Sequence, residues 1–236
     1  MMRFIRNIGE IAAISFDLDD TLYDNRPVIA RAEQWMVSNL QARHCQVAEL
    51  GLSHWRTLKS ELLKLIPALA DDPSACRHRL VEWGLTRHGV PAADARQSAD
   101  LILSGFLEER ARIQVSPATL SLLKALGERW PLAALTNGNL PLEKTVLQGC
   151  FSHVVQAGRG LRMKPEPDLF EQLADELKLE PSQILHIGDH PLTDVEGARR
   201  AGYLSGWLNL AGRPSPQLTT LPDLEISDLE DLRVLL

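Results

Sequence analysis

The chain lacks a long apolar run and a secretion signal. No segment of its 236 residues approaches the roughly 18 apolar residues that a membrane-spanning helix needs. The opening stretch "MMRFIRNIGEIAAISF" is interrupted by Glu10 and is followed by Asp17. A signal peptide needs an unbroken apolar stretch and a small-residue cleavage site. We therefore expect a cytoplasmic protein with no membrane partner.

Paired cysteines and a basic excess are also missing. The three cysteines are an odd number, and none forms a CxxC or a zinc-ligand spacing. We expect them to be free thiols in a reducing compartment. The formal net charge of -6 argues against a nucleic-acid partner, because nucleic-acid binders usually present a basic face. No pattern fixes the oligomeric state, and we expect a monomer or a homodimer.

Five short apolar runs recur along the chain, and each ends near Asp, Gly or Thr-Asn-Gly. They cover residues 11–16, 131–139, 153–158, 183–189 and 204–210. Runs this apolar are typical of strands buried on both faces of a parallel sheet. Helical patterns separate the later runs: Ser116 and Asp168 are expected to cap two helices, and Gly202 to end a short third one. Strands alternating with helices predict a doubly wound, Rossmann-like α/β core.

Residues 26–112 follow a helical period with no strand pattern between them. We expect a four-helix insert between the first and second strands of the core. The predicted domains are therefore an α/β core over 1–25 and 113–236 and a helical domain over 26–112. The proline-rich stretch 212–223 is predicted to be a surface loop before a short strand and helix at the C-terminus.

Polar residues follow three of the predicted strands, where parallel sheets bind their ligands. They are Asp17, Thr136 and Asp189. Asp19 is two residues beyond Asp17, so in extended backbone both carboxylates point the same way. Two carboxylates in one crevice need a cation. Carboxylate oxygens favour Mg²⁺, which is often coordinated by a phosphate as well. This edge of the sheet is the predicted site.

Four residues suit the same site, and each of them could instead have an ordinary structural role. Asp194 could support a metal ion, or it could cap the following helix. The Thr136 hydroxyl and the backbone N–H groups around Asn137 could hold phosphoryl oxygens, although Asn-Gly is also common in ordinary turns. Lys164 carries a compact charge that suits a phosphate oxygen, although a lone loop lysine is usually solvated.

Four segments of the chain resemble the motifs of the haloacid-dehalogenase-like hydrolases: "FDLDDTL", "LTNGN", "MKPEPDLF" and "HIGDHPLTD". The helical insert resembles the mobile cap of that family. The resemblance implies Mg²⁺-dependent phosphoryl transfer through an aspartyl-phosphate. It assigns the nucleophile to Asp17, the general acid and base to Asp19, and the positioning of phosphate to Thr136 and Lys164. The implied Mg²⁺ ligands are Asp17, the backbone carbonyl of Asp19, and Asp189, with Asp194 in support.

Several alternatives stay open within and outside this family. True dehalogenases lack the second acid of the first motif, and Asp19 is present here. A phosphomutase or a phosphatase of broad specificity for sugars and nucleotides would use the same acids. A phospho-accepting signalling domain also uses Asp, Thr, Lys and Mg²⁺, but it is about half this length. An inactive ligand-binding module is the remaining non-enzyme alternative.

The segments "SFDLDDTLYDNRP" and "LEISDLEDL", with the Trp-bearing helices, are similar to the bacterial flavin-pathway phosphatases of the family. The similarity implies riboflavin biosynthesis and a small phosphorylated metabolite as the partner, either 5-amino-6-(5-phosphoribitylamino)uracil or flavin mononucleotide (FMN). Tyr23, Asn25 and Arg26 either meet that substrate or form a hinge with Tyr23 packed in the core. Asp20 is expected in a turn. Trp35, Trp55 and Trp83 are expected to pack in the helical core.

Overall fold

Two compact units make up the chain in a computed structural model that describes residues 1–210 and 220–236. The α/β unit comprises Met1–Asp24, Gln114–Gly138 and Val146–Leu236, and the helical unit comprises Asn25–Ile113 and Asn139–Thr145. This division gives the helical unit a second segment that we did not anticipate. The predicted domain boundaries stay a prediction. Of the predicted surface loop 212–223, residues 212–219 lie outside the described part.

A seven-stranded sheet forms the centre of the α/β unit, in the order β1-β7-β6-β5-β2-β3-β4. Only the pair of β1 and β7 is antiparallel. All five predicted apolar runs are strands here, which confirms the doubly wound core. The strands are β1 (Arg3–Phe4), β2 (Ala13–Phe16), β3 (Leu132–Thr136), β4 (His153–Gln156), β5 (Ile184–Gly188), β6 (Leu204–Leu208) and β7 (Leu224–Ile226).

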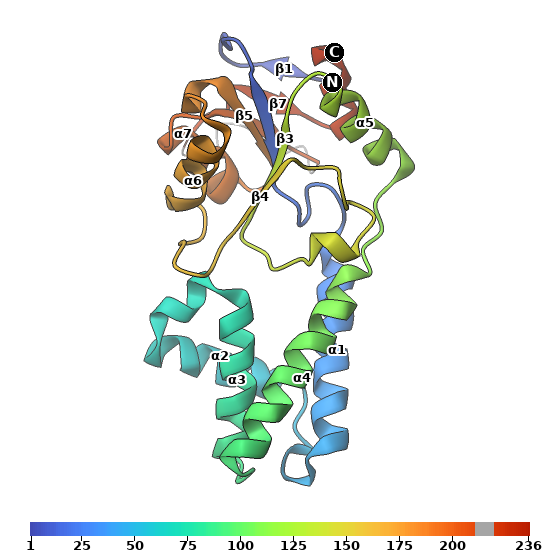
Figure 1. Ribbon diagram of the computed structural model, residues 1–236, viewed down its shortest axis with the longest axis vertical. Helices are drawn as coiled ribbons and strands as arrows, with labels where there is room; N and C mark the ends of the chain where they lie inside the picture. The colour runs from blue at the N-terminus through green and yellow to red at the C-terminus, as the bar shows by residue number, and fades with distance from the viewer. Residues whose placement is uncertain (211–219) are drawn as a thin grey trace. The chain divides into compact units, whose positions relative to one another are not determined.

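Helices cover both faces of this sheet. Figure 1 shows α6 and α7 on one side of the strands and α5 on the other. Ser116 caps α5 as predicted, because its side chain accepts a hydrogen bond from the backbone N–H of Thr119. The helices of this unit are α5 (Pro117–Gly127), α6 (Asp168–Leu177) and α7 (Gly197–Arg200), with a π-helix at Pro191–Glu196 and 3-10 turns at Pro181–Gln183 and Leu229–Leu235.

The predicted cap of α6 is wrong. Asp168 is the first residue inside the helix, and Pro167 occupies the cap position. The Asp168 carboxylate turns instead to Arg162, accepting from its backbone N–H and from its guanidinium. A bidentate ion pair with arginine is a stronger attraction than a helix cap, and sequence spacing alone does not reveal it.

Four helices form the helical unit, as predicted: α1 (Asn25–Arg43), α2 (Leu52–Leu65), α3 (Pro73–Arg87) and α4 (Ala92–Ala111). The remaining turns are 3-10 segments at Cys45–Val47, Pro67–Asp71 and Leu142–Lys144. The unit has its own hydrophobic core, in which Trp55 is fully buried and Trp35 and Trp83 are partly buried. The expected packing role of these tryptophans is therefore confirmed. None of the described helices combines the length and the apolarity needed to cross a bilayer.

Candidate active site

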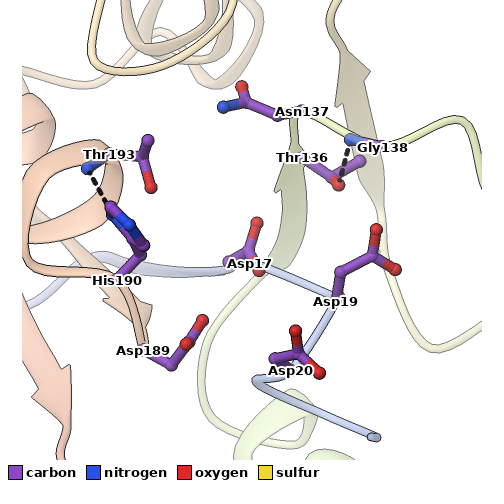
Figure 2. Close-up of a pocket in the computed structure, with 9 residues that line it drawn as sticks. All are labelled: Asp17, Asp19, Asp20, Thr136, Asn137, Gly138, Asp189, His190 and Thr193. Carbon is purple, nitrogen blue, oxygen red and sulfur yellow. Dashed lines mark hydrogen bonds between the residues drawn. The ribbon is translucent and has the colours of Figure 1, made fainter. Parts of the chain in front are cut away.

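One pocket lies at the carboxyl ends of the central strands, wholly within the α/β unit (Figure 2). Asp17 directly follows β2, and Asp189 directly follows β5, its neighbour in the sheet. Thr136 ends β3, the strand on the other side of β2. The residues that line the pocket are Asp17, Asp19, Asp20, Thr136, Asn137, Gly138, Asp189, His190 and Thr193. Three neighbouring parallel strands therefore bring distant sequence segments to one point.

A tight turn after β2 carries the second acid. The backbone N–H of Asp20 donates to the carbonyl of Tyr23 at 2.9 Å. Asp20 has a φ of +62°, in the left-handed region, so the predicted turn is confirmed. The hydroxyl of Thr21 lies between the two strand-end acids, 3.4 Å from Asp17 Oδ2 and 3.3 Å from Asp189 Oδ1. The turn thus holds Asp19 and Thr21 beside Asp17.

Lys164 is a buried cation shared by two carboxylates. Its Nζ lies 2.8 Å from Asp17 Oδ1, 2.7 Å from Asp194 Oδ1 and 2.7 Å from the carbonyl of Leu135. Only 2% of Lys164 is exposed, so it is not a solvated loop lysine. Burial acts to lower the pKa of Lys164, but Asp17 and Asp194 outweigh burial and hold that pKa above its ordinary value. The ammonium is therefore charged whenever these carboxylates are.

The Thr136-Asn137 segment fixes the lysine loop. Asn137 donates from its side-chain nitrogen to the Lys164 carbonyl at 2.9 Å and accepts from the Lys164 backbone N–H at 2.7 Å. The Thr136 hydroxyl accepts from the backbone N–H of Gly138 at 2.9 Å. The side chain of Asn137 is thus committed to the protein. Its predicted contact with phosphate stays a prediction.

Asp194 lies beneath the pocket rather than in its lining. Its Oδ1 contacts Lys164 Nζ, and its Oδ2 accepts from the backbone N–H of His190 at 3.0 Å. Asp194 is not the helix cap, because His190 caps this helix with Nδ1, which accepts from the N–H groups of Leu192 and Thr193. Space also fixes Asp194: a Cβ added at Gly188 would be 2.4 Å from its Cγ. Gly188 is therefore required for this carboxylate to occupy its position.

A buried polar pair lies below Asp194. The ring of His186 contacts Asp194 Oδ1 through Nε2 at 3.4 Å and Ser15 Oγ through Nδ1 at 2.9 Å. Ser15 and His186 are direct partners in the register of β2 and β5. Burial, and then the charge of Lys164, lowers the pKa of His186 to about 4. The ring is therefore neutral near pH 7.

Sequence reasoning missed Ser15, Thr21, His186 and Thr193 as members of the site. The sequence does contain a signal for Ser15 and His186, since each is the one polar residue in an otherwise apolar strand. Their register could not be read from the sequence. Of the predicted residues, Asp17, Asp19, Thr136, Asn137 and Asp189 line one pocket, and Lys164 and Asp194 are buried against it.

The electrostatics of the cluster suit a cation. Ligand oxygens of Asp17, Asp189 and Asp194 lie within 4.8 Å of one another. Three carboxylates face one lysine, so the cluster is two charges short of neutrality when all four groups are ionised. Burial raises the pKa of Asp17 to about 8, and burial with the charge of Asp194 raises that of Asp189. Hard oxygen donors with excess negative charge fit a divalent metal ion.

Comparison with known proteins agrees with this geometry. The family model described as haloacid dehalogenase-like hydrolase matches residues 11–202. The chain belongs to this family. It is 37% identical to 5-amino-6-(5-phospho-D-ribitylamino)uracil phosphatase YigB of Escherichia coli K12, over the full length of both chains. It is also 32% identical to a phosphoserine phosphatase of Thermus thermophilus, covering 71% of this chain and 68% of that one.

A solved structure is also similar over nearly the whole chain. It is described as a 2-haloacid dehalogenase from Pseudomonas syringae, with a TM-score of 0.88 and 31% identity, and the match covers 95% of this chain and 97% of that one. The matches confirm the expected fold and a hydrolase of this family. The curated relatives support a phosphatase.

Proposed function

We propose that the chain is a Mg²⁺-dependent phosphatase that hydrolyses a small phosphomonoester through an aspartyl-phosphate on Asp17. The observation that carries this proposal is the position of Asp17. It lies at the centre of one pocket with a second acid, a threonine at a neighbouring strand end, and a buried lysine on its carboxylate. Within the haloacid dehalogenase-like family, the presence of Asp19 favours phosphoryl transfer.

In the first step, a carboxylate oxygen of Asp17 attacks phosphorus and the bond from phosphorus to the ester oxygen breaks. The leaving oxygen takes the proton of Asp19, so the product alcohol leaves neutral. In the second step, the Asp19 carboxylate takes a proton from water while the water oxygen attacks the aspartyl-phosphate. Inorganic phosphate leaves, and Asp17 is a carboxylate again.

Positive charge has to accompany these steps, because the nucleophile and the substrate are both anions. Lys164 supplies one charge in contact with Asp17. A bound Mg²⁺ would supply the rest by neutralising the phosphoryl oxygens and the nucleophile. Asp17, Asp189 and the Asp19 carbonyl would hold the ion. Asp194, which contacts Lys164 through one oxygen and the His190 N–H through the other, would support the ion with its negative charge.

The proposed substrate is 5-amino-6-(5-phosphoribitylamino)uracil, with FMN as the second choice. Its support is the 37% identity over full length to a protein named for that reaction. A phosphomutase or a phosphatase of broad specificity remains the alternative within the same chemistry. The resemblance to flavin-pathway phosphatases supports a place in riboflavin biosynthesis, and the cytoplasmic location stays a prediction from the sequence.

A second candidate is 2-haloacid hydrolysis, favoured by the structure with a TM-score of 0.88. The same nucleophile would displace a halide from carbon, and a halide needs no proton to leave. Asp19 in the pocket lining has no use as an acid in that reaction. We therefore rank it below the phosphatase.

The deciding experiment measures product release by the purified chain with Mg²⁺, and again with a chelator. The substrates are the uracil phosphate, FMN, a sugar phosphate and 2-chloropropionate. We expect phosphate release only with Mg²⁺, fastest on the uracil phosphate, and no chloride release. Asp17→Asn is expected to remove all activity while the thermal midpoint stays within a few degrees. Phosphate release by Asp17→Asn above a hundredth of the wild-type rate would refute the nucleophile.

A further inference from the structure

A buried tyrosine holds the second acid of the site. The hydroxyl of Tyr23 donates a hydrogen bond to Asp19 Oδ1. Tyr23 is only 6% exposed, whereas Asp19 lines the pocket and is half-buried. Tyr23 itself is absent from the pocket lining, so it reaches the chemistry through Asp19. Both residues belong to the α/β unit.

The backbone between the two residues is closely held. Asp19 and Tyr23 form an isolated parallel β-bridge, and the N–H of Asp20 donates to the Tyr23 carbonyl at 2.9 Å. The N–H of Leu22 donates to the carbonyl of Leu18 at 3.0 Å, and the side chain of Leu22 is buried. These bonds fix the spacing of the phenol and the carboxylate. The hydroxyl therefore meets Asp19 in a preset position.

We infer that Tyr23 is a positioning residue that orients the Asp19 carboxyl group for proton transfer; this inference rests on the proposed function. Because Tyr23 donates to Oδ1, protonation of Asp19 is favoured at the other oxygen. The proton is carried by Oδ2, and rotation of the carboxyl group, which would exchange the two oxygens, is resisted by the phenol. General acid catalysis depends on such geometry, because the proton has to lie in line with the leaving oxygen.

The test compares substrates that differ in their need for that proton. An alkyl phosphate such as FMN leaves as a strongly basic alkoxide and needs the acid. Para-nitrophenyl phosphate leaves as a stable phenolate and does not. With enzyme in excess over FMN, the rate of riboflavin release in a single turnover reports the first step. With para-nitrophenyl phosphate, the rate of the nitrophenolate burst reports the same step without the acid.

We expect Tyr23→Phe to slow riboflavin release about tenfold, a part of the contribution of roughly 10²–10⁴ from general acid catalysis. The nitrophenolate burst is expected to change less than about twofold, and its amplitude counts the folded active sites in the same sample. Equal slowing of both substrates would overturn the inference, because a merely structural role or a role in binding substrate has no dependence on the leaving group.

Two further variants separate the possible failures. Tyr203→Phe is the matched control, because Tyr203 is also buried and its hydroxyl donates to the Phe170 carbonyl away from the pocket. It is expected to leave both first-step rates unchanged. Asp19→Asn is expected to slow the FMN step strongly and to spare the burst. If Asp19→Asn spares both, the proposed acid and the inference fail together. If Asp19→Asn slows riboflavin release and spares the nitrophenolate burst, but Tyr23→Phe does not show this selective slowing, only the inference fails.

Discussion

At the scale of single residues, the site is a continuous set of buried polar contacts. It runs from Asp17 to Lys164, Asp194, His186 and Ser15. The buried charges in this set are paired, because an isolated one would cost several kcal/mol. The packing around these groups leaves little room for change. Removing or crowding one member is expected to affect the others.

Gly188 tests how strictly the space around Asp194 is defined. In Gly188→Ala, the new methyl group would be 2.4–2.5 Å from Asp194 Cγ, Cβ and Oδ2, so this carboxylate has to move. We expect a loss of about 1–3 kcal/mol in the free energy of unfolding. Phosphatase activity is expected to fall about tenfold or more, since misplacement of the site by about 1 Å can cost up to a hundredfold.

Gly9→Ala is the matched control, because no atom lies within 4 Å of its added methyl group and the residue belongs to no helix or strand. It is expected to stay within about 0.5 kcal/mol of the wild type. Urea unfolding and steady-state phosphate release measure both variants. A Gly188→Ala protein as stable and active as Gly9→Ala would show that Asp194 tolerates displacement.

His186 predicts a dependence of stability on pH. Burial lowers the pKa of His186 from 6.5 to about 4, so between these values the unfolded chain binds a proton that the folded chain does not. This protonation difference therefore lowers stability as the pH falls from about 6.5 to about 4. His186→Gln removes the titrating group. The difference in unfolding free energy between wild type and variant should shrink by about 2–3 kcal/mol from pH 7 to pH 4.5.

Urea unfolding in chelator, at both pH values, measures this difference. Groups that do not contact His186 titrate alike in the two proteins, so the comparison isolates the ring and its contact with Asp194. An unchanged difference between pH 7 and pH 4.5 would mean that the ring can be protonated in the folded state without cost.

At the scale of secondary structure, apolar runs and cap residues predicted most of the elements. The strands were predictable because both faces of a parallel sheet are buried, which leaves near-continuous apolar runs such as β2 and β5. Ser116 was predictable because its partner, the Thr119 N–H, is three residues away. The role of Asp168 was not predictable, since its side chain pairs with Arg162, which precedes the helix. The π-helix after His190 was also not predicted, because its cap is the Nδ1 atom of a histidine.

Helix α5 offers a test of a local prediction. Ser116→Ala removes the acceptor that lies 3.0 Å from the Thr119 nitrogen, and we expect it to cost about 1 kcal/mol. Ser116→Asp keeps an acceptor at the cap and adds a negative charge at the N-terminal end, so it should match the wild type within a few tenths of a kcal/mol. Thermal unfolding of the three proteins measures this. Equal stability of the alanine and aspartate variants would show that this cap contributes nothing.

At the scale of the whole molecule, the four resembling segments predicted which residues meet, and the fold explains why. Residues 17, 136 and 189 lie far apart in the sequence but follow or end strands that are neighbours in the sheet. Depth could not be predicted from the sequence. Lys164 and Asp194 are buried below the pocket, and the side chain of Asn137 binds the lysine loop. Burial depends on the final packing of several segments and has no local signal.

The charge of the assembled site leads to a prediction for the metal. With Asp17, Asp189 and Asp194 facing one lysine, a divalent ion should bind the folded chain and not the unfolded one. At about 100 times its dissociation constant, such an ion stabilises the folded state by about 2.7 kcal/mol. We expect Mg²⁺ to raise the thermal midpoint of the chelator-treated protein. Asp189→Asn should abolish this shift, whereas Ser116→Ala, outside the site, should retain it in full. A shift that persists in Asp189→Asn would assign the ion to another place on the molecule. A different cation would then have to compensate the carboxylates of the pocket.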